Sequence, residues 1–89
     1  MEKVTVTISD PIGLHARPAS QISKVAAKFK SDIKISTTTN SANAKSLLNI
    51  MSLAAKQGQE ITLEANGEDE KEAIEKLVET LEEANLISR

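Results

Sequence analysis

Val4-Thr5-Val6-Thr7-Ile8-Ser9-Asp10-Pro11-Ile12-Gly13 is the stretch from which the fold can be worked out. In its first half, β-branched apolar residues alternate with Thr and Ser, and this period of two predicts a half-buried strand over residues 2–9. Asp10-Pro11-Ile12-Gly13 has the composition of a turn. After the turn, apolar side chains recur at spacings of three and four, which predicts a helix that ends near Lys28 and carries Pro18 in its first turn. These side chains are Ala19, Ile22, Ala26 and Phe29.

The middle of the chain repeats this succession of strand and helix patterns. Alternation around Ile33 and Ile35 predicts a second strand over residues 32–37, and the polar segment that follows leaves room for a turn and a short strand over 41–44. A short, very apolar helix is expected from Leu47 to Ala54, with Ser46 as its N-cap and Gly58 just past its end.

The last third of the chain predicts one more strand and one more helix. Alternation over residues 61–66 predicts the strand, and Asn66-Gly67 is a turn signal. The helix is expected to start around Asp69, which with Glu72 resembles a capping box, and Glu72 and Lys76 are spaced as an i,i+4 ion pair. The order strand-helix-strand-strand-helix-strand-helix predicts the α+β class, with one antiparallel or mixed sheet covered on one face by helices.

Length and composition limit what the chain can be. Its 89 residues are enough for one small core, so residues 1–89 are expected to form a single domain. Phe29 is the only aromatic residue, which argues against nucleic-acid recognition by stacked rings. With no cysteine and one histidine, disulfides, thiolate metal sites and multi-histidine metal sites are excluded, and no cofactor is expected. No apolar stretch is long enough for a membrane span and nothing resembles a secretory signal, so a cytoplasmic protein without membrane contact is expected.

Charge is distributed unevenly along the chain. Residues 1–59 hold eight basic and three acidic side chains, a net charge of +5, whereas residues 60–89 hold three basic and ten acidic ones, a net charge of −7. The first part is therefore suited to attract anions or acidic partners while the second keeps the protein in solution. The alternative is that both are solvated faces without a partner.

His15, the only histidine, has an unusual setting. It follows a glycine turn at an expected helix start, where backbone N–H groups lack partners and the helix dipole is positive. Arg17 adds a permanent cation whose planar fork matches phosphate oxygens, so Ala16 and Arg17 are the expected phosphate-binding residues. A neutral imidazole is a nucleophile, and the site is suited to accept and pass on a phosphoryl group. The alternative is a surface histidine beside a helix cap.

Two segments resemble the signatures of a known family. Gly13-Leu14-His15-Ala16-Arg17-Pro18-Ala19 resembles the active-site signature of the HPr family, the histidine-containing phosphocarrier proteins of the bacterial sugar phosphotransferase system. Residues 45–53, Lys45-Ser46-Leu47-Leu48-Asn49-Ile50-Met51-Ser52-Leu53, resemble the family's second signature, around its regulatory serine. The resemblance covers essentially the whole chain.

The resemblance implies a fold and a function. The implied fold is a two-layer open-faced sandwich, with a four-stranded antiparallel sheet in the order 1-4-2-3, three helices on one face and the order βαββαβα. The implied function is that of a carrier and not an enzyme. Enzyme I passes a phosphoryl group derived from phosphoenolpyruvate to Nδ1 of His15, Arg17 contacts the phosphoryl oxygens, and His15 passes the group to a sugar-specific IIA protein or domain. The protein is expected to be a monomer.

The helix that begins after Ser46 has two interpretations, which are compatible. Ser46 is an expected N-cap, and the resemblance implies that it can also be phosphorylated, with an HPr kinase/phosphorylase and a transcriptional regulator as further partners. The helix is apolar around most of its circumference, more than a one-sided core requires, which indicates a docking surface. The expected docking residues are Leu47, Leu48, Met51, Lys24 and Lys45.

Three other functions are alternatives to a phosphoryl carrier for sugar uptake. The nitrogen-related paralogue of HPr is a carrier of the same class, but its second signature differs more from residues 45–48. A purely regulatory HPr-like protein acting through Ser46 lacks the active-site histidine, so His15 argues against it. A non-catalytic αβ interaction module that binds RNA or protein belongs to a different class, and the scarcity of aromatic residues and the mild net charge of −2 argue against RNA.

Overall fold

A computed structural model describes residues 1–87 and contains four strands and three helices in the predicted order. The elements, in chain order, are β1 (Glu2–Thr7), α1 (Ala16–Ala26), β2 (Asp32–Ser36), β3 (Ser41–Asn43), α2 (Leu47–Ser52), β4 (Glu60–Asn66) and α3 (Glu70–Glu83). The short strand left open by the sequence is therefore present as β3. The first strand is shorter than predicted, because Ile8 forms only an isolated bridge with Ile87.

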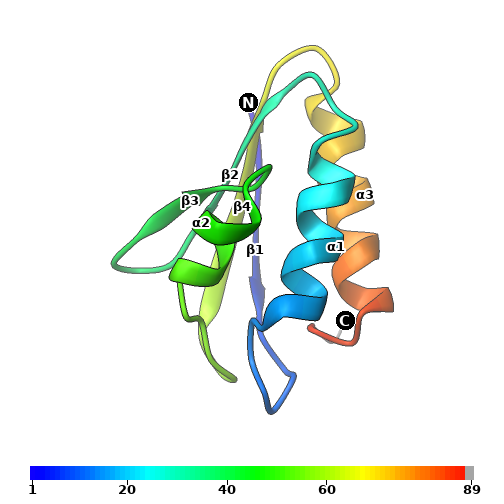
Figure 1. The fold of residues 1–89 in the computed structure, drawn as a ribbon. Helices are drawn as coiled ribbons and strands as arrows, with labels where there is room; N and C mark the ends of the chain where they lie inside the picture. The colour runs from blue at the N-terminus through cyan, green and yellow to red at the C-terminus, as the bar shows by residue number, and fades with distance from the viewer. Residues whose placement is uncertain (88–89) are drawn as a thin grey trace.

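The four strands form one antiparallel sheet in the order β1-β4-β2-β3. The last strand of the chain thus lies between the first two, where Val4 faces Leu63 and Leu63 also faces Ile35. Figure 1 shows α1 and α3 side by side along one face of the sheet, with α2 nearer to β3. The predicted α+β class, the open-faced sandwich and the strand order 1-4-2-3 are confirmed.

The core between the sheet and the helices is aliphatic. Ile35 and Leu63 from the sheet and Ile22 and Leu77 from the helices are completely buried. The lone aromatic residue, Phe29, only packs at the border of this cluster. Val, Ile and Leu side chains pack well on the pleated surface of a sheet, so the core can be filled without aromatic rings.

The glycine expected to end the second helix, Gly58, has a different place from the one predicted. The residue beyond α2 with left-handed backbone angles is Ala54, with a φ of 49°. Gly58 also has a positive φ, but it lies farther on, where its N–H donates to the Ile8 carbonyl at 2.8 Å and leads the chain into β4. The prediction that Gly58 directly follows the second helix was therefore wrong by about one turn.

The capping box predicted at the start of α3 is also wrong. Asp69 is the N-cap residue, but its carboxylate makes no capping hydrogen bond to α3. It accepts instead from Lys30 N at 2.8 Å and from Ser31 N at 3.0 Å, and it also accepts from the hydroxyl of Ser31. Farther along α3, Lys76 pairs with Glu79 at 3.3 Å rather than with Glu72. The Asp69 side chain therefore ties α3 to the loop that enters β2.

The hydrogen bonds from residues 30–31 to Asp69, called the Asp69 clamp below, make the stability of the fold depend on pH. The hydroxyl of Ser31 and then the N–H of Lys30 hold the pKa of Asp69 at about 2, below its ordinary value of 3.8. Since the pKa is lower in the folded chain, the stabilisation is present above about pH 4 and is lost as the pH falls toward 2. We expect Asp69→Asn to melt at a lower temperature than the wild type at neutral pH, and the difference to shrink over this window. Thermal melting from pH 7 to pH 2 measures it.

Glu68→Gln is the matched control, because Glu68 is an exposed carboxylate next to the Asp69 clamp. It should melt as the wild type does at each pH. A difference between Asp69→Asn and the wild type that stays constant down to pH 2 would contradict the assignment of the pH dependence to Asp69.

Candidate functional site

The loop between β1 and α1 is held in place by the far end of the chain. Ser9 N and Asp10 N both donate to the Leu86 carbonyl, at 2.8 and 3.2 Å. Asp10 then closes a turn, in which its carbonyl accepts from Gly13 N at 2.9 Å and its side-chain Oδ1 accepts from Ile12 N, also at 2.9 Å. A side-chain acceptor two residues before the donor is the usual Asx turn, so the predicted turn at Asp10–Gly13 has a clear local cause.

The end of this loop is pressed against the segment that follows α2. Leu14 is buried, and its N–H donates to the Ala55 carbonyl at 2.9 Å. Gly13 has a φ of +83°, and a Cβ added there would lie 2.6 Å from that same carbonyl oxygen and 3.0 Å from Cα of Lys56. Only glycine combines this backbone angle with this close approach. The loop and the segment after α2 therefore have a fixed separation.

His15 is the N-cap residue of α1. Its backbone is extended, with φ −112° and ψ −175°, and its carbonyl accepts the first helical hydrogen bond, from Ala19 N at 3.1 Å. Its side chain makes no capping bond. The N–H groups of Ala16 and Arg17 lie too close to the helix start to donate a hydrogen bond within α1. Pro18 lies in the first turn as predicted, where it is buried, and it has no N–H. The helix start thus leaves two donors beside His15.

The imidazole of His15 is about one-third exposed, at 34%. Its Nε2 lies 3.6 Å from Oδ2 of Asp10, whose side chain is 15% exposed. The sequence analysis named Asp10 only as part of the turn and gave it no role at His15, although the two residues are only five positions apart. The signal that could have found it is the Asx turn, which directs a side chain from Asp10 back across the turn toward the residues that follow.

The two predicted cations of α1 are both exposed. Arg17, in the first turn, forms no ion pair or side-chain hydrogen bond within residues 1–87. Its guanidinium is therefore available to an incoming anion beside the helix start. Lys24 lies in the last turn of α1, two turns away from Arg17. It is exposed and is not part of the immediate surroundings of His15.

Ser46 caps α2 as the sequence predicted. Its Oγ accepts from the backbone N–H of Asn49 at 3.3 Å and from Nδ2 of Asn49 at 3.1 Å. Such a cap is worth about 0.5–2 kcal/mol. The amide of Asn49, which the sequence analysis did not single out, therefore doubles the contacts of the cap.

The apolar surface expected on α2 is exposed. Leu48 is 79% exposed, Met51 40% and Leu47 37%, whereas Ile50 is completely buried and forms the inner face. The sequence analysis missed Ile12, which is 72% exposed and lies on the loop before His15. Leu47, Leu48 and Met51 are called the α2 patch below. Exposed apolar side chains gathered on one short helix are typical of an interaction surface.

Lys45 connects α2 to the end of α1. It is half-buried, and its Nζ donates to the Phe29 carbonyl at 2.9 Å. The prediction placed Lys45 at a docking surface, and the structure shows that one donor of its ammonium is already used inside the protein.

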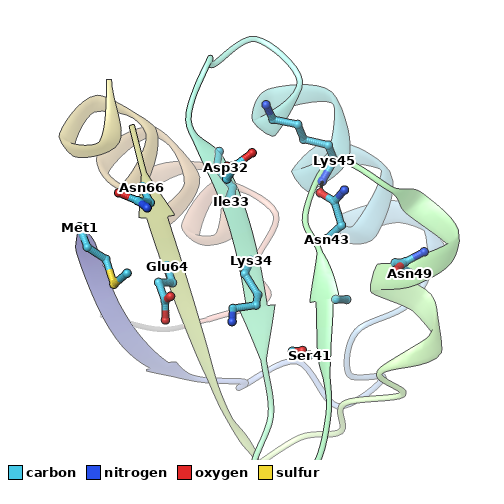
Figure 2. Close-up of a pocket in the computed structure, with 11 residues that line it drawn as sticks. Met1, Asp32, Ile33, Lys34, Ser41, Asn43, Lys45, Asn49, Glu64 and Asn66 are labelled. Carbon is cyan, nitrogen blue, oxygen red and sulfur yellow. Dashed lines mark hydrogen bonds between the residues drawn. The ribbon is translucent and has the colours of Figure 1, made fainter. Parts of the chain in front are cut away.

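Of four grooves on the surface of residues 1–87 that stand out among others, the largest lies away from His15, with a volume of about 450 Å³. It crosses the open face of the sheet, where Figure 2 shows Lys34 on β2 between Glu64 on β4 and the side chains of β3. Its lining mixes both signs of charge with amides, and neither His15 nor Arg17 lines any of the four. These grooves therefore offer no small-molecule pocket at the histidine.

Among residues 1–87, His, Asp and Glu side chains do not come together in groups of three that could hold a metal ion. No helix in the same range is long and apolar enough to cross a bilayer.

The arrangement is suited to hold an anion on a nucleophile. The imidazole lies at a helix start with open N–H groups, Arg17 follows two residues later without a side-chain partner among residues 1–87, and the Asp10 carboxylate lies 3.6 Å from Nε2 of the ring. Open N–H groups and a guanidinium bind phosphate oxygens, while an imidazole nitrogen can bond covalently to phosphorus. The partly exposed imidazole of His15 is accessible from the surface of the protein.

Comparison with known proteins places the chain in a family. Residues 2–83 match the model of the PTS HPr component phosphorylation site. The chain is 46% identical over 88 residues to the phosphocarrier protein HPr of Mycoplasma pneumoniae, covering 98% of this chain and 100% of that protein. A solved mycoplasma histidine-containing phosphocarrier protein is 42% identical, with a TM-score of 0.97 over 99% of this chain and 100% of the other. Crh of Bacillus subtilis, described as a swapped dimer, is 40% identical with a TM-score of 0.73, over 99% and 100% of the two chains.

The contact at Gly13 predicts a specific cost of adding a methyl group. Gly13→Ala should lower the free energy of unfolding by roughly 2–4 kcal/mol, since it adds the strain of a positive φ to an overlap with the Ala55 carbonyl. It should also shift the amide NMR signals of the loop around His15. Chemical denaturation and a heteronuclear correlation spectrum measure both effects.

Gly58→Ala is the matched control, because Gly58 has a similar φ of +89° but its added Cβ meets no atom within 4 Å. It should cost only the backbone strain, about 1–2 kcal/mol, and leave the signals around His15 unchanged. Equal costs for the two variants would show that the close approach at Gly13 does not constrain the loop.

Proposed function

The chain belongs to the HPr family of phosphotransferase-system proteins, and on that premise we propose that it carries a phosphoryl group on His15. HPr proteins are phosphocarriers and not catalysts. In this proposal Nδ1 of His15 accepts the group from phosphorylated enzyme I and donates it to a sugar-specific IIA protein or domain. The single observation that carries the proposal is the placement of the imidazole at the start of α1, beside two open N–H groups.

The surroundings of His15 support a phosphorylated state in three ways. The N–H groups of Ala16 and Arg17 can donate to phosphoryl oxygens, and the start of α1 is the positive end of an 11-residue helix dipole. The Arg17 guanidinium is free of other partners within residues 1–87 and can add charge-assisted hydrogen bonds. All three act after transfer on a group that has two negative charges, so they stabilise the carrier's loaded form.

The α2 patch is the proposed docking surface for the two protein partners. Its three apolar side chains are exposed, and the segment after α2 contacts the loop that holds His15. Ile12 on the loop before His15, Lys24 on α1 and Lys45 before α2 are proposed to add one apolar and two basic groups to this surface. Enzyme I and IIA proteins would then both approach the same side of the molecule, one after the other, with the carrier acting as a monomer in the cytoplasm.

Ser46 is the proposed site of regulation. It is half-buried at the start of α2, directly before Leu47, so a phosphoryl group on its Oγ would stand at the border of the α2 patch. A dedicated kinase/phosphorylase would add and remove this group, and a transcriptional regulator could recognise it. The added charge of about −1.5 to −2 would replace an apolar border with an anionic one.

The proposed function is tested by the fate of acid-labile phosphate. Wild-type protein incubated with enzyme I and phosphoenolpyruvate should gain one phosphoryl group that is lost in acid, because N–P bonds hydrolyse readily there. His15→Ala should fold as the wild type does, since the imidazole is partly exposed and does not cap α1, and should take up none. Intact mass before and after acid treatment measures the outcome.

Ser46→Ala is the control and should still gain one acid-labile phosphoryl group, because the proposed acceptor is His15 and the substitution adds no charge at the border of the α2 patch. Acid-labile phosphate on His15→Ala would refute the assignment of the site. An acid-stable adduct on the wild type, or none, would overturn the proposed function itself.

Ser46→Asp tests the regulatory proposal. Asp is as good an N-cap as Ser, so its melting temperature should equal that of the wild type or lie slightly above it. The rate of phosphorylation by enzyme I should fall severalfold relative to the wild type because binding is poorer. Higher salt should reduce this difference in rate, because salt screens the repulsion between the added charge and an acidic partner. Melting curves and initial rates at two ionic strengths measure this. Unchanged rates would remove Ser46 from the docking surface, and a large drop in melting temperature would mean misfolding.

A further inference from the structure

The carboxylate of Asp10 is held rigidly toward one nitrogen of His15. Its backbone N–H is bound to the Leu86 carbonyl, and its own carbonyl and Oδ1 accept from Gly13 N and Ile12 N. These bonds leave the second carboxylate oxygen, Oδ2, directed at Nε2 of His15, 3.6 Å away. This distance is slightly longer than a hydrogen bond, as is common for catalytic contacts in a free protein that tighten in the complex.

We propose that Asp10 is a positioning residue that keeps the ring proton on Nε2 of His15 and so makes Nδ1 the nitrogen that receives the phosphoryl group. This inference rests on the proposed function. It concerns the carrier's own choice of nitrogen, for which the contact between Asp10 and His15 is the direct observation.

The hydrogen-bonding capacity of the carboxylate and of the two ring nitrogens determines which tautomer of His15 is favoured. An ionised carboxylate only accepts, and in a neutral imidazole one nitrogen is a donor while the other has the free electron pair. A carboxylate that faces Nε2 therefore favours the tautomer with hydrogen on Nε2. The electron pair then lies on Nδ1, the nitrogen that does not face Asp10.

The transfer step balances without moving a proton. The electron pair of Nδ1 forms a bond to the phosphorus of phosphorylated enzyme I, and the bond between phosphorus and the donor atom breaks, with its electron pair remaining on the donor. Nε2 keeps its hydrogen, so the ring of the product has a positive charge. That charge faces the Asp10 carboxylate, while the phosphoryl oxygens are free to meet Arg17. The onward transfer runs through the same states in reverse, with the ring as leaving group.

Asp10→Asn is the decisive variant, because Asn keeps the Asx turn and removes the charge. With its oxygen occupied by Ile12 N, the Asn side chain turns its NH₂ group toward Nε2, and this donor favours the opposite tautomer. We expect the share of the Nε2–H tautomer in the neutral ring to fall, as read from the ¹⁵N chemical shifts of the two ring nitrogens. We also expect kcat of enzyme I for the carrier to fall by roughly tenfold or more, with KM unchanged, because Asp10 is not part of the α2 patch.

Asp32→Asn is the matched control. It removes the same charge from an exposed position at the start of β2. Figure 1 shows that β2 and α1 begin at opposite ends of the molecule. Its tautomer ratio and both kinetic constants should match those of the wild type. If Asp32→Asn lost as much kcat as Asp10→Asn, the effect would be one of net charge and the proposal would be wrong.

The wild-type spectrum alone can also overturn the inference, even if Asp10→Asn were to fold poorly. A wild-type ring with its hydrogen mainly on Nδ1 contradicts the role given to Asp10, as does an equal tautomer ratio in the wild type and Asp10→Asn. Either result would leave the proposed function intact, provided that the wild type gains acid-labile phosphate and His15→Ala does not. Failure of that mass measurement would instead refute the carrier function.

Discussion

The functional end of the molecule depends on one backbone contact, between the loop before α1 and the segment after α2. Leu14 N donates to the Ala55 carbonyl, and Gly13 lies so close to the same peptide that a methyl group would overlap it. Residues 41 positions apart in the chain are thereby held in contact. His15 follows Leu14 directly, so its position relative to α2 is set by this contact and not by the loop's own length.

This contact joins two sets of residues with different chemistry. The groups proposed to handle the phosphoryl group lie within one short segment, from Asp10 to Arg17, and local structure is enough to arrange them: an Asx turn, a positive φ and a helix start. The α2 patch lies on a separate helix, and as the proposed docking surface it must stay at a fixed place beside His15. In the proposed function, a rigid contact between the two is therefore a requirement, because the carrier would present one surface to two partners in turn.

The predictions made from the sequence succeeded where the cause is local and failed where it is tertiary. Alternation and helical spacing predicted every element except β3, whose polar segment has no clear pattern. Ser46 caps α2 as expected, since its partner, Asn49, is three residues away. The order of the strands came from the family resemblance, because periodicity does not say that β4 pairs with both β1 and β2. The capping box failed because Asp69 finds better donors in Ser31 and Lys30, on a loop that the pattern could not place beside it. Asp10 was overlooked for a related reason: the pattern showed a turn but not where its second carboxylate oxygen points.

The exposure of the site explains why such a protein carries a group and does not turn over a substrate. In the free protein, the N–H groups at the start of α1 and the guanidinium of Arg17 face water, which screens them. In the proposed function, the attraction of these groups for phosphoryl oxygens becomes strong only when a docked partner excludes that water. The contact between the Asp10 carboxylate and the His15 ring is less dependent on docking, because the carboxylate is only 15% exposed. In the proposed mechanism the ring is thus prepared by the carrier itself, whereas the stabilisation of the transferred group is completed by the partner that binds the α2 patch, so that transfer is coupled to recognition.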